Sequence, residues 1–307
     1  MEVTRQQDQL RLNSENRNVA CRDARVAKPK ATNQHRAGID MTNHKKVFHR
    51  PLIGAMALLG VISLASLSAQ ARDLPEIQND VFQVANSGAY PPFSYVDTSG
   101  NLVGFDVDIA EALADRMGVD VNIQTSPWNG IVAALAGGRF DACICSMSVT
   151  EERKQAVDFT DSYYSSGLSI WVQEGTDDVN SIEDFAGKRV GSTLGETGNQ
   201  WATENSNGNW RNQTFQGLPD MLNGLTTGRI DVMIADDIPV YVALNDGNMA
   251  IKQVDVGELP SWPAAIAIQK NKPALKEALN TALAEIKADG TYQQIVDKWI
   301  GEGVEFD

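Results

Sequence analysis

The feature that most constrains the fold of this chain is a repeat of eight residues. Residues 135–142 read LAGGRFDA and residues 225–232 read LTTGRIDV, although a match this short also arises by chance. Each copy joins the end of a helical pattern to a glycine turn and an apolar strand. A polar residue follows each aspartate by five positions, Ser146 in the first copy and Asp236 in the second. Because ligands bind beyond the carboxyl ends of strands in open α/β sheets, the repeat predicts two similar lobes around a cleft.

The rest of the chain shows the same alternation of strands and helices. Short apolar runs alternate with apolar stripes at helical spacing, and glycines close several of these stripes. The expected strands cover residues 82–85, 119–123 and 142–145, and the expected helices cover residues 109–117, 131–135, 275–286 and the segment around 295–299. We therefore predict an α/β fold.

A secretory signal peptide is predicted ahead of this body. Residues 45–50 contain two lysines and an arginine, residues 53–67 carry no charge, and residues 69–71 read AQA, an A-x-A cleavage pattern. The uncharged run is shorter than the roughly 20 residues of a membrane-spanning helix, so we expect cleavage after Ala71 and no retained anchor. Residues 1–40 are polar, and we expect either a start of translation at Met41 or a disordered extension.

The charge of the body excludes nucleic acid as a partner. The whole chain has 26 Lys and Arg against 40 Asp and Glu residues, a net charge of −14. Residues 1–71 hold 11 of the basic residues and five of the acidic ones, so the body carries −20. Phosphate binding needs a basic face, whereas an acidic surface suits a soluble exported protein. With no cysteine near the cleavage site for a lipid anchor, we predict a periplasmic location.

Cysteine and histidine usage limits the chemistry of the mature part. Cys143 and Cys145 are two apart on an expected strand, near the outer limit of disulfide geometry, and we predict buried free thiols. Two ligands are too few for a metal site. The three histidines, at positions 35, 44 and 49, all precede the cleavage site. This excludes a histidine-based triad or metal cluster, and we expect no metal and no cofactor.

A candidate anion site follows the first repeat. Thr150 suits a helix N-cap, and Arg153 would then lie in the first turn beside free backbone N–H groups. A guanidinium there matches the two oxygens of a carboxylate, and Ser146 and Ser148 lie close enough in sequence to add hydrogen bonds. The other interpretation is a capped helix with no ligand, and the local sequence leaves both open.

Three further residues complete a possible binding site. Asp236 either caps a helix or faces Arg153 across the cleft, in which case the pair matches the two charges of a zwitterion. Tyr90 and Trp128 lie in expected loops, the first beside Pro91 and Pro92. Their rings either cover the core beneath or form aromatic walls of the site.

Six segments together resemble the bacterial extracellular solute-binding proteins of family 3, the polar amino-acid binders. They run in family order over nearly all of residues 80–300. The segments are 89–95 (AYPPFSY), 104–108 (GFDVD), 128–131 (WNGI), 146–153 (SMSVTEER), 158–164 (DFTDSYY) and 287–292 (KADGTY).

The resemblance implies a two-lobed periplasmic-binding-protein fold of type II, which closes on its ligand like a flytrap. Lobe 1 would comprise residues 76–166 plus 257–307, and lobe 2 would comprise residues 167–256. By motif position, the implied ligand-binding residues are Arg153 for a carboxylate with Ser146 and Ser148 beside it, Asp236 for an ammonium group, Tyr90 and Trp128 as aromatic walls, and Glu196 and Thr197 in the facing loop of lobe 2.

One position departs from the family pattern. Ser87 stands where binders of basic amino acids or glutamine in this family often carry an aspartate that holds the ligand side chain. Its absence argues against a basic ligand, whereas the unusual acid Glu196 could compensate. The sequence leaves these two interpretations open.

The function implied by the resemblance is delivery of a polar amino acid or derivative to an ABC importer. The partners would be the ligand, a membrane permease and an ATPase, and the protein would be a monomer without enzymatic activity. Two alternatives remain. An exported dehydratase or lyase of the same fold could use Glu196 as a base, and a sensor would deliver the ligand to a receptor.

Overall fold

The computed structural model describes residues 74–247 and 249–304. The predicted signal peptide, its cleavage site after Ala71 and the extension over residues 1–40 lie outside the described residues. Within them the chain forms a mixed α/β structure, as predicted.

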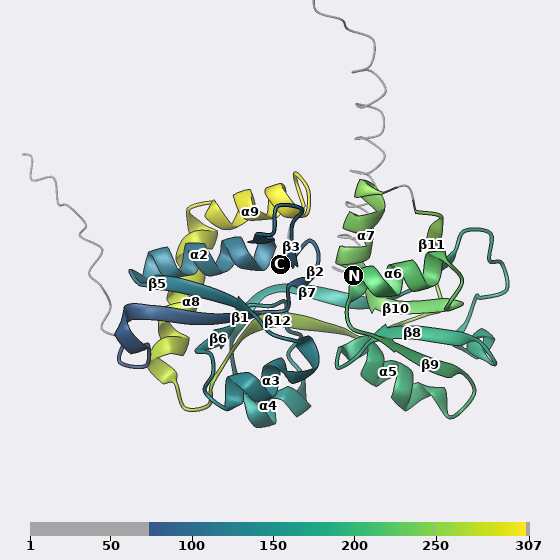
Figure 1. Ribbon diagram of the computed structural model, residues 1–307, viewed down its shortest axis with the longest axis horizontal. Coiled ribbons are helices and arrows are strands. Elements are labelled where there is room, and N and C mark those ends of the chain that lie inside the picture. Colours follow the sequence, from purple (N-terminus) through teal and green to yellow (C-terminus); the bar gives the residue numbers. More distant parts are fainter. Residues whose placement is uncertain (1–73, 248, 305–307) are drawn as a thin grey trace, which may run out of the picture.

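One long strand connects two sheet regions. β7 (Asp158–Gln173) pairs antiparallel with β12 (Ser261–Ile268) along its first part, and with β10 (Val232–Asp236) and β11 (Ile251–Val254) along its last part. The strand order is β5-β1-β6-β12-β7-β10-β8-β9, with β11 also beside β7. Figure 1 shows the two regions side by side, with helices on both faces of each.

The first region is a mixed sheet between two layers of helices. Its parallel strands are β5 (Asp120–Thr125), β1 (Val81–Asn86) and β6 (Ala142–Cys143). One face carries α2 (Phe105–Met117), α8 (Pro273–Ala288) and α9 (Thr291–Trp299), and the other carries α3 (Trp128–Ala136) and α4 (Glu151–Ala156). The apolar stripe of α8 packs on α2 through buried residues such as Leu279 and Leu113, which explains the periodicity of the sequence there.

The second region repeats this arrangement with fewer elements. β8 (Arg189–Thr193) lies parallel between β9 (Arg211–Phe215) and β10. Helix α5 (Thr197–Ser206) covers one face, and α6 (Leu218–Thr226) and α7 (Asp237–Asp246) cover the other. Separate apolar clusters fill the two faces, so this region has a core of its own.

The sequence repeat corresponds to one hydrogen-bonded unit in each region. Asp141 Oδ2 accepts a 2.8 Å hydrogen bond from the N–H of Gln83, within β1. Asp231 Oδ2 accepts the matching 2.8 Å bond from the N–H of Arg189, at the start of β8. The turn glycine that both copies of the repeat share has a left-handed backbone, with φ of 82° at position 138 and 71° at position 228. The predicted pair of similar α/β units is therefore present.

The remaining elements are short, and they correct three details of the sequence analysis. They are the small antiparallel sheet of β2 (Ala89–Tyr90), β3 (Ser94–Val96) and β4 (Leu102–Val103), and the 3₁₀ turns η1 (Gln78–Asp80) and η2 (Ile182–Phe185). Tyr90 belongs to a strand because it pairs with Ser94, and Trp128 begins α3. The prediction that Tyr90 and Trp128 lie in loops is therefore wrong. The expected strand over 142–145 ends at Cys143.

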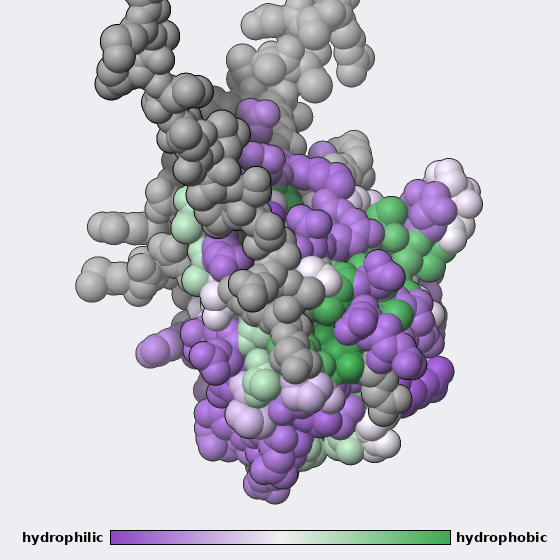
Figure 2. Space-filling model, turned by 90° about the vertical axis from the view of Figure 1, so that its left-hand side faces the viewer, coloured by the Kyte–Doolittle hydropathy of each residue, from purple (hydrophilic) through white to green (hydrophobic). Residues whose placement is uncertain are grey.

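The described part of one face of the molecule is mainly hydrophilic. Figure 2 shows this for the face at the left of Figure 1, where polar side chains surround a smaller apolar area. Among the described residues, no helix combines the length and apolar character that a membrane crossing requires.

Candidate ligand-binding site

A cavity of about 190 Å³ lies between the two regions. Its first-region lining is Ser87, Ala89, Tyr90, Pro127, Trp128, Cys145, Ser146, Ser148 and Arg153, and its second-region lining is Glu196, Thr197, Gln216, Gly217 and Asp236. All nine residues predicted to bind ligand therefore lie around one cavity, and their role in binding stays a prediction. An outer cavity of about 340 Å³ shares Trp128, Arg153 and Glu196 with it.

Arg153 is held at the cavity by its helix and by both regions. The Thr150 hydroxyl caps α4 by accepting a 3.2 Å hydrogen bond from the N–H of Arg153, as predicted. The guanidinium lies 5.3 Å from the Trp128 ring centroid. It donates to the carbonyl oxygen of Ser148 at 2.9 Å and, across the cleft, to that of Gly195 at 3.0 Å. Burial lowers the pKa of Arg153, but an arginine stays charged.

Asp236 and Tyr90 connect the two regions on the other side of the cavity. Asp236 ends β10 and precedes α7, and its carboxylate accepts a 2.6 Å hydrogen bond from the Tyr90 hydroxyl. Burial raises the pKa of Asp236 to about 6, against the opposing effects of the Tyr90 hydrogen bond and Arg153. Burial, followed by the nearby Asp236 charge, raises the pKa of Tyr90 well above its usual value, so its hydroxyl stays a donor.

Glu196 places a second carboxylate at this cavity. It stands at the N-cap position of α5, next to Thr197. Burial is the main reason that its pKa rises to about 8, and the negative charge of Asp236 raises it further. Arg153 acts in the opposite direction. The cavity therefore contains one guanidinium and two carboxyl groups.

A buried hydrogen-bond network fixes Ser146. Its backbone is left-handed, with φ of 55°, and its N–H donates to the Tyr163 hydroxyl at 2.8 Å. The Ser146 hydroxyl donates to Asp106 Oδ2 at 2.8 Å, and the Tyr163 hydroxyl donates to Oδ1 of the same carboxylate at 2.8 Å. Burial raises the pKa of Asp106 to about 7. These contacts give a non-glycine residue the unusual conformation that turns this segment toward the cavity.

Sequence reasoning missed several residues of this site. Asp106 and Tyr163 were noted only as parts of motifs, because their partners come from distant segments. Gln216 and Gly217 line the cavity and directly follow β9. Ser146 and Asp236 likewise lie at or just after the end of a strand. The position at a strand end was therefore the signal that could have identified Gln216 and Gly217. Cys145 also lines the cavity.

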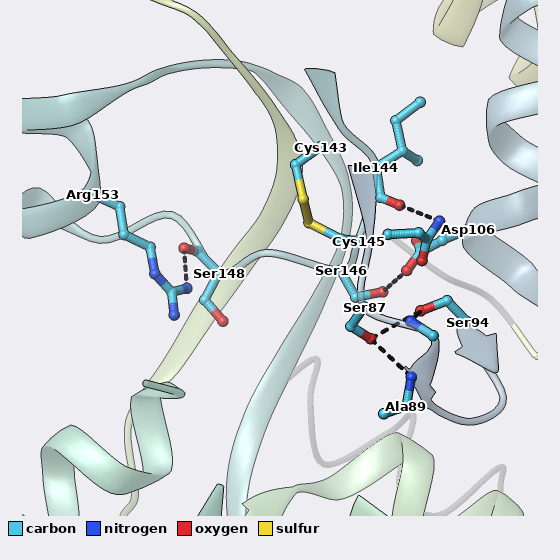
Figure 3. The surroundings of a disulfide bond; sticks show 12 residues. Ser87, Ala89, Ser94, Asp106, Cys143, Ile144, Cys145, Ser146, Ser148 and Arg153 are labelled. Atoms are coloured by element: carbon cyan, nitrogen blue, oxygen red, sulfur yellow. Dashed lines mark hydrogen bonds between the residues drawn. A yellow bond between two sulfur atoms is a disulfide. The ribbon is translucent and has the colours of Figure 1, made fainter. Parts of the chain in front are cut away.

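Cys143 and Cys145 form a disulfide, so the prediction of free thiols is wrong (Figure 3). The prediction assumed that both cysteines lie on one extended strand. Because β6 ends at Cys143, the chain turns and the two Cα atoms lie 5.5 Å apart, within the usual disulfide range. The bond ties the buried strand to the segment that carries Ser146 into the cavity.

We expect the Cys143→Ser/Cys145→Ser double variant to unfold a few degrees below the wild type. The disulfide closes a very short loop, so in the chain-entropy model it contributes only about 1–2 kcal/mol. Differential scanning fluorimetry with and without a reductant measures the difference, and reductant should affect only the wild type. Alkylation of the denatured exported protein should modify neither cysteine before reduction, and modification of both would contradict the disulfide.

The arrangement matches a known family of proteins. Residues 82–302 match the model of bacterial extracellular solute-binding proteins, family 3. The chain belongs to this family. An L-cystine-binding protein of Escherichia coli K12, TcyJ, is 31% identical over 262 residues, covering 82% of this chain and 97% of the relative. ABC transporter arginine-binding protein 1 of the same organism is 31% identical over 216 residues, covering 69% and 88%.

A solved structure of the same kind supports the fold. An ancestral amino-acid-binding protein described as a precursor of cyclohexadienyl dehydratase is 34% identical and has a TM-score of 0.66, covering 72% of this chain and 96% of the other. The chain thus has the two-lobed type II fold of family 3 solute-binding proteins, as the sequence predicted, and its cavity lies between the two regions.

Ser87 places a small, neutral group at one side of the cavity. Its hydroxyl lies 3.1 Å from that of Ser94 and accepts a 3.4 Å bond from the N–H of Ala89 (Figure 3). The acidic residues at the cavity, Glu196 and Asp236, both come from the second region.

Proposed function

We propose that this protein is the periplasmic substrate-binding component of an amino-acid ABC importer. The observation that carries the proposal is that Arg153 and Asp236, of opposite charge, line one cavity from different regions. The guanidinium would bind the ligand carboxylate, and Asp236 would bind the α-ammonium group. Tyr90 and Trp128 would pack on the aliphatic part, with Ser146, Ser148 and Thr197 adding hydrogen bonds. The names of the relatives support an amino acid as the ligand class.

The pairing of β7 supports the proposed lobes. Lobe 1 comprises residues 76–166 plus 257–307, and lobe 2 comprises residues 167–256. In support, β7 pairs with β12 up to position 167 and with β10 from position 168. A monomer released after Ala71 would close on its ligand and dock on a permease that an ATPase powers. The alternative role is sensing, in which the protein delivers the ligand to a receptor. Transport and sensing would use the same cavity.

We infer binding without catalysis. The sequence has no histidine after position 49, which removes the commonest general acid and base. The related dehydratase precursor keeps an enzymatic alternative in view, with Glu196 as the base. Incubation with cyclohexadienyl acids, followed by chromatography, should show no product, and turnover that Glu196→Gln abolishes would favour the enzyme instead.

A screen of the exported protein against amino acids tests the proposed function. A ligand at 100 times its Kd stabilises the folded state by about 2.7 kcal/mol, which corresponds to a rise in Tm of about 5–10 °C for a protein of this size. We expect at least one amino acid to produce such a rise by differential scanning fluorimetry. Its amide and its N-acetyl derivative should produce much smaller rises, because each lacks one charge. A complete absence of amino-acid responses would reject the proposal.

A further inference from the structure

We propose that the ligand is an amino acid with a cationic side chain and that Glu196 selects for this charge. The inference rests on the proposed function, and it names the ligand class for the same cavity. It also decides between the two interpretations that the sequence left open at Ser87 and Glu196.

The first argument is the charge of the cavity. Among the described residues, the acidic and basic side chains that line it are Arg153, Glu196 and Asp236. The carboxylate and α-ammonium of an amino acid would neutralise Arg153 and Asp236. Glu196 then remains as one further acid in a partly buried, enclosed space, where its ionised form is costly unless a cation lies nearby. A second cationic group on the ligand would neutralise it.

The contacts of Arg153 and Asp236 agree with this comparison of charges. Arg153 directs two N–H groups at backbone carbonyl oxygens, those of Ser148 and Gly195, and not at a carboxylate. Asp236 accepts its hydrogen bond from the neutral Tyr90 hydroxyl. At these contacts Arg153 does not bind the carboxylate of Asp236 or Glu196 directly. A ligand of complementary charge would supply a cation to these acids.

The position of Glu196 is fixed by the backbone around it. The preceding Gly195 packs on the Trp128 side of lobe 1, such that an added Cβ would lie 3.6 Å from Trp128 Cδ1. Glu196, Trp128 and Arg153 line both the inner and the outer cavity. Glu196 therefore lies where the two cavities adjoin, beside an aromatic ring that favours cations.

Protonation gives a second, independent signature. The groups that face Glu196 are Asp236 of β10, Arg153 of α4 and Tyr90 of β2, and burial with the Asp236 charge keeps its pKa near 8. A bound cation would stabilise the anion, so the proton leaves on binding. Affinity for a cationic ligand should therefore rise between pH 6 and pH 9, whereas affinity for a neutral ligand should change little through this group.

The test compares arginine with citrulline, which has nearly the same shape but no side-chain charge. In titration calorimetry at pH 8 with the exported protein, we expect arginine to bind at least 30-fold more tightly. Glu196→Gln should reduce this preference to threefold or less, with citrulline affinity within threefold of the wild type. The matched control is Glu174→Gln, which changes an exposed carboxylate that lines neither cavity and should keep the preference. In the wild type, two buffers of different ionisation enthalpy should reveal proton release with arginine.

Three results would overturn the inference. If the wild type binds citrulline or another neutral amino acid as tightly as arginine, the cationic class is wrong, but the proposed function stands. If Glu196→Gln weakens both ligands equally, Glu196 does not select for charge. If no amino acid binds at all, the proposed function fails, and this inference fails with it.

Discussion

Replacing Arg153 by alanine should weaken amino-acid binding by a hundredfold or more. The guanidinium is the only cationic side chain in the lining of the described cavity, so its removal leaves the ligand carboxylate opposite two acids. Leaving one member of a buried charge pair without its partner typically costs about 3–5 kcal/mol, which corresponds to at least two orders of magnitude in Kd. The variant also loses the 3.0 Å contact with Gly195 that crosses the cleft.

Titration calorimetry of the exported protein measures this loss, and a second arginine provides the control. Arg139 is exposed and lies 5.1 Å from the Phe140 ring centroid, an arrangement like that of Arg153 over Trp128, but away from the cavity. Arg139→Ala should bind as the wild type does. An affinity of Arg153→Ala within threefold of the wild type, with a normal Tm, would show that the carboxylate is bound elsewhere.

Part of the candidate site was predictable from local position, whereas Ser87, Glu196 and Thr197 were predicted only through the family resemblance. Ser146 comes shortly after β6, and Asp236 ends β10, and the sequence repeat alone related these two positions. Arg153 could be placed in the first turn of α4 from the capping threonine. Such features depend on residues that are neighbours in the sequence, so the sequence alone is enough to predict them.

The parts that were not predictable depend on contacts between distant segments. The disulfide forms because the chain turns after Cys143, and no local pattern marked that turn. Asp106 supports Ser146 through contacts 40 residues apart, and Tyr163 joins them from β7. The hydrogen bond between Tyr90 and Asp236 spans 146 residues. Side-chain partners of this kind are set by the tertiary arrangement, which periodicity and capping rules do not describe.

Replacing Asp236 by alanine should both weaken binding by about a hundredfold and prevent full closure. The substitution removes the expected partner of the ligand ammonium, a loss of the same order as that at Arg153. It also removes the acceptor of the 2.6 Å hydrogen bond from Tyr90, which joins the two lobes. A ligand shifts the protein toward the closed state only through its stronger binding to that state. Without Asp236, the ligand retains its contacts with lobe 1 and loses its main charged contact with lobe 2.

Small-angle scattering separates these two effects. At saturating ligand the wild type should show a smaller radius of gyration than the ligand-free protein, as expected for hinge closure. Asp236→Ala should remain more extended even when calorimetry shows that it is saturated. Tyr90→Phe loses only the contact between lobes and keeps the acid, so it should still become compact. Asp220→Ala removes an exposed charge of lobe 2 in the first turn of α6 and should behave as the wild type. Tight binding by the wild type with no change in its scattering would contradict capture by closure, because the ligand would then be held by one lobe alone.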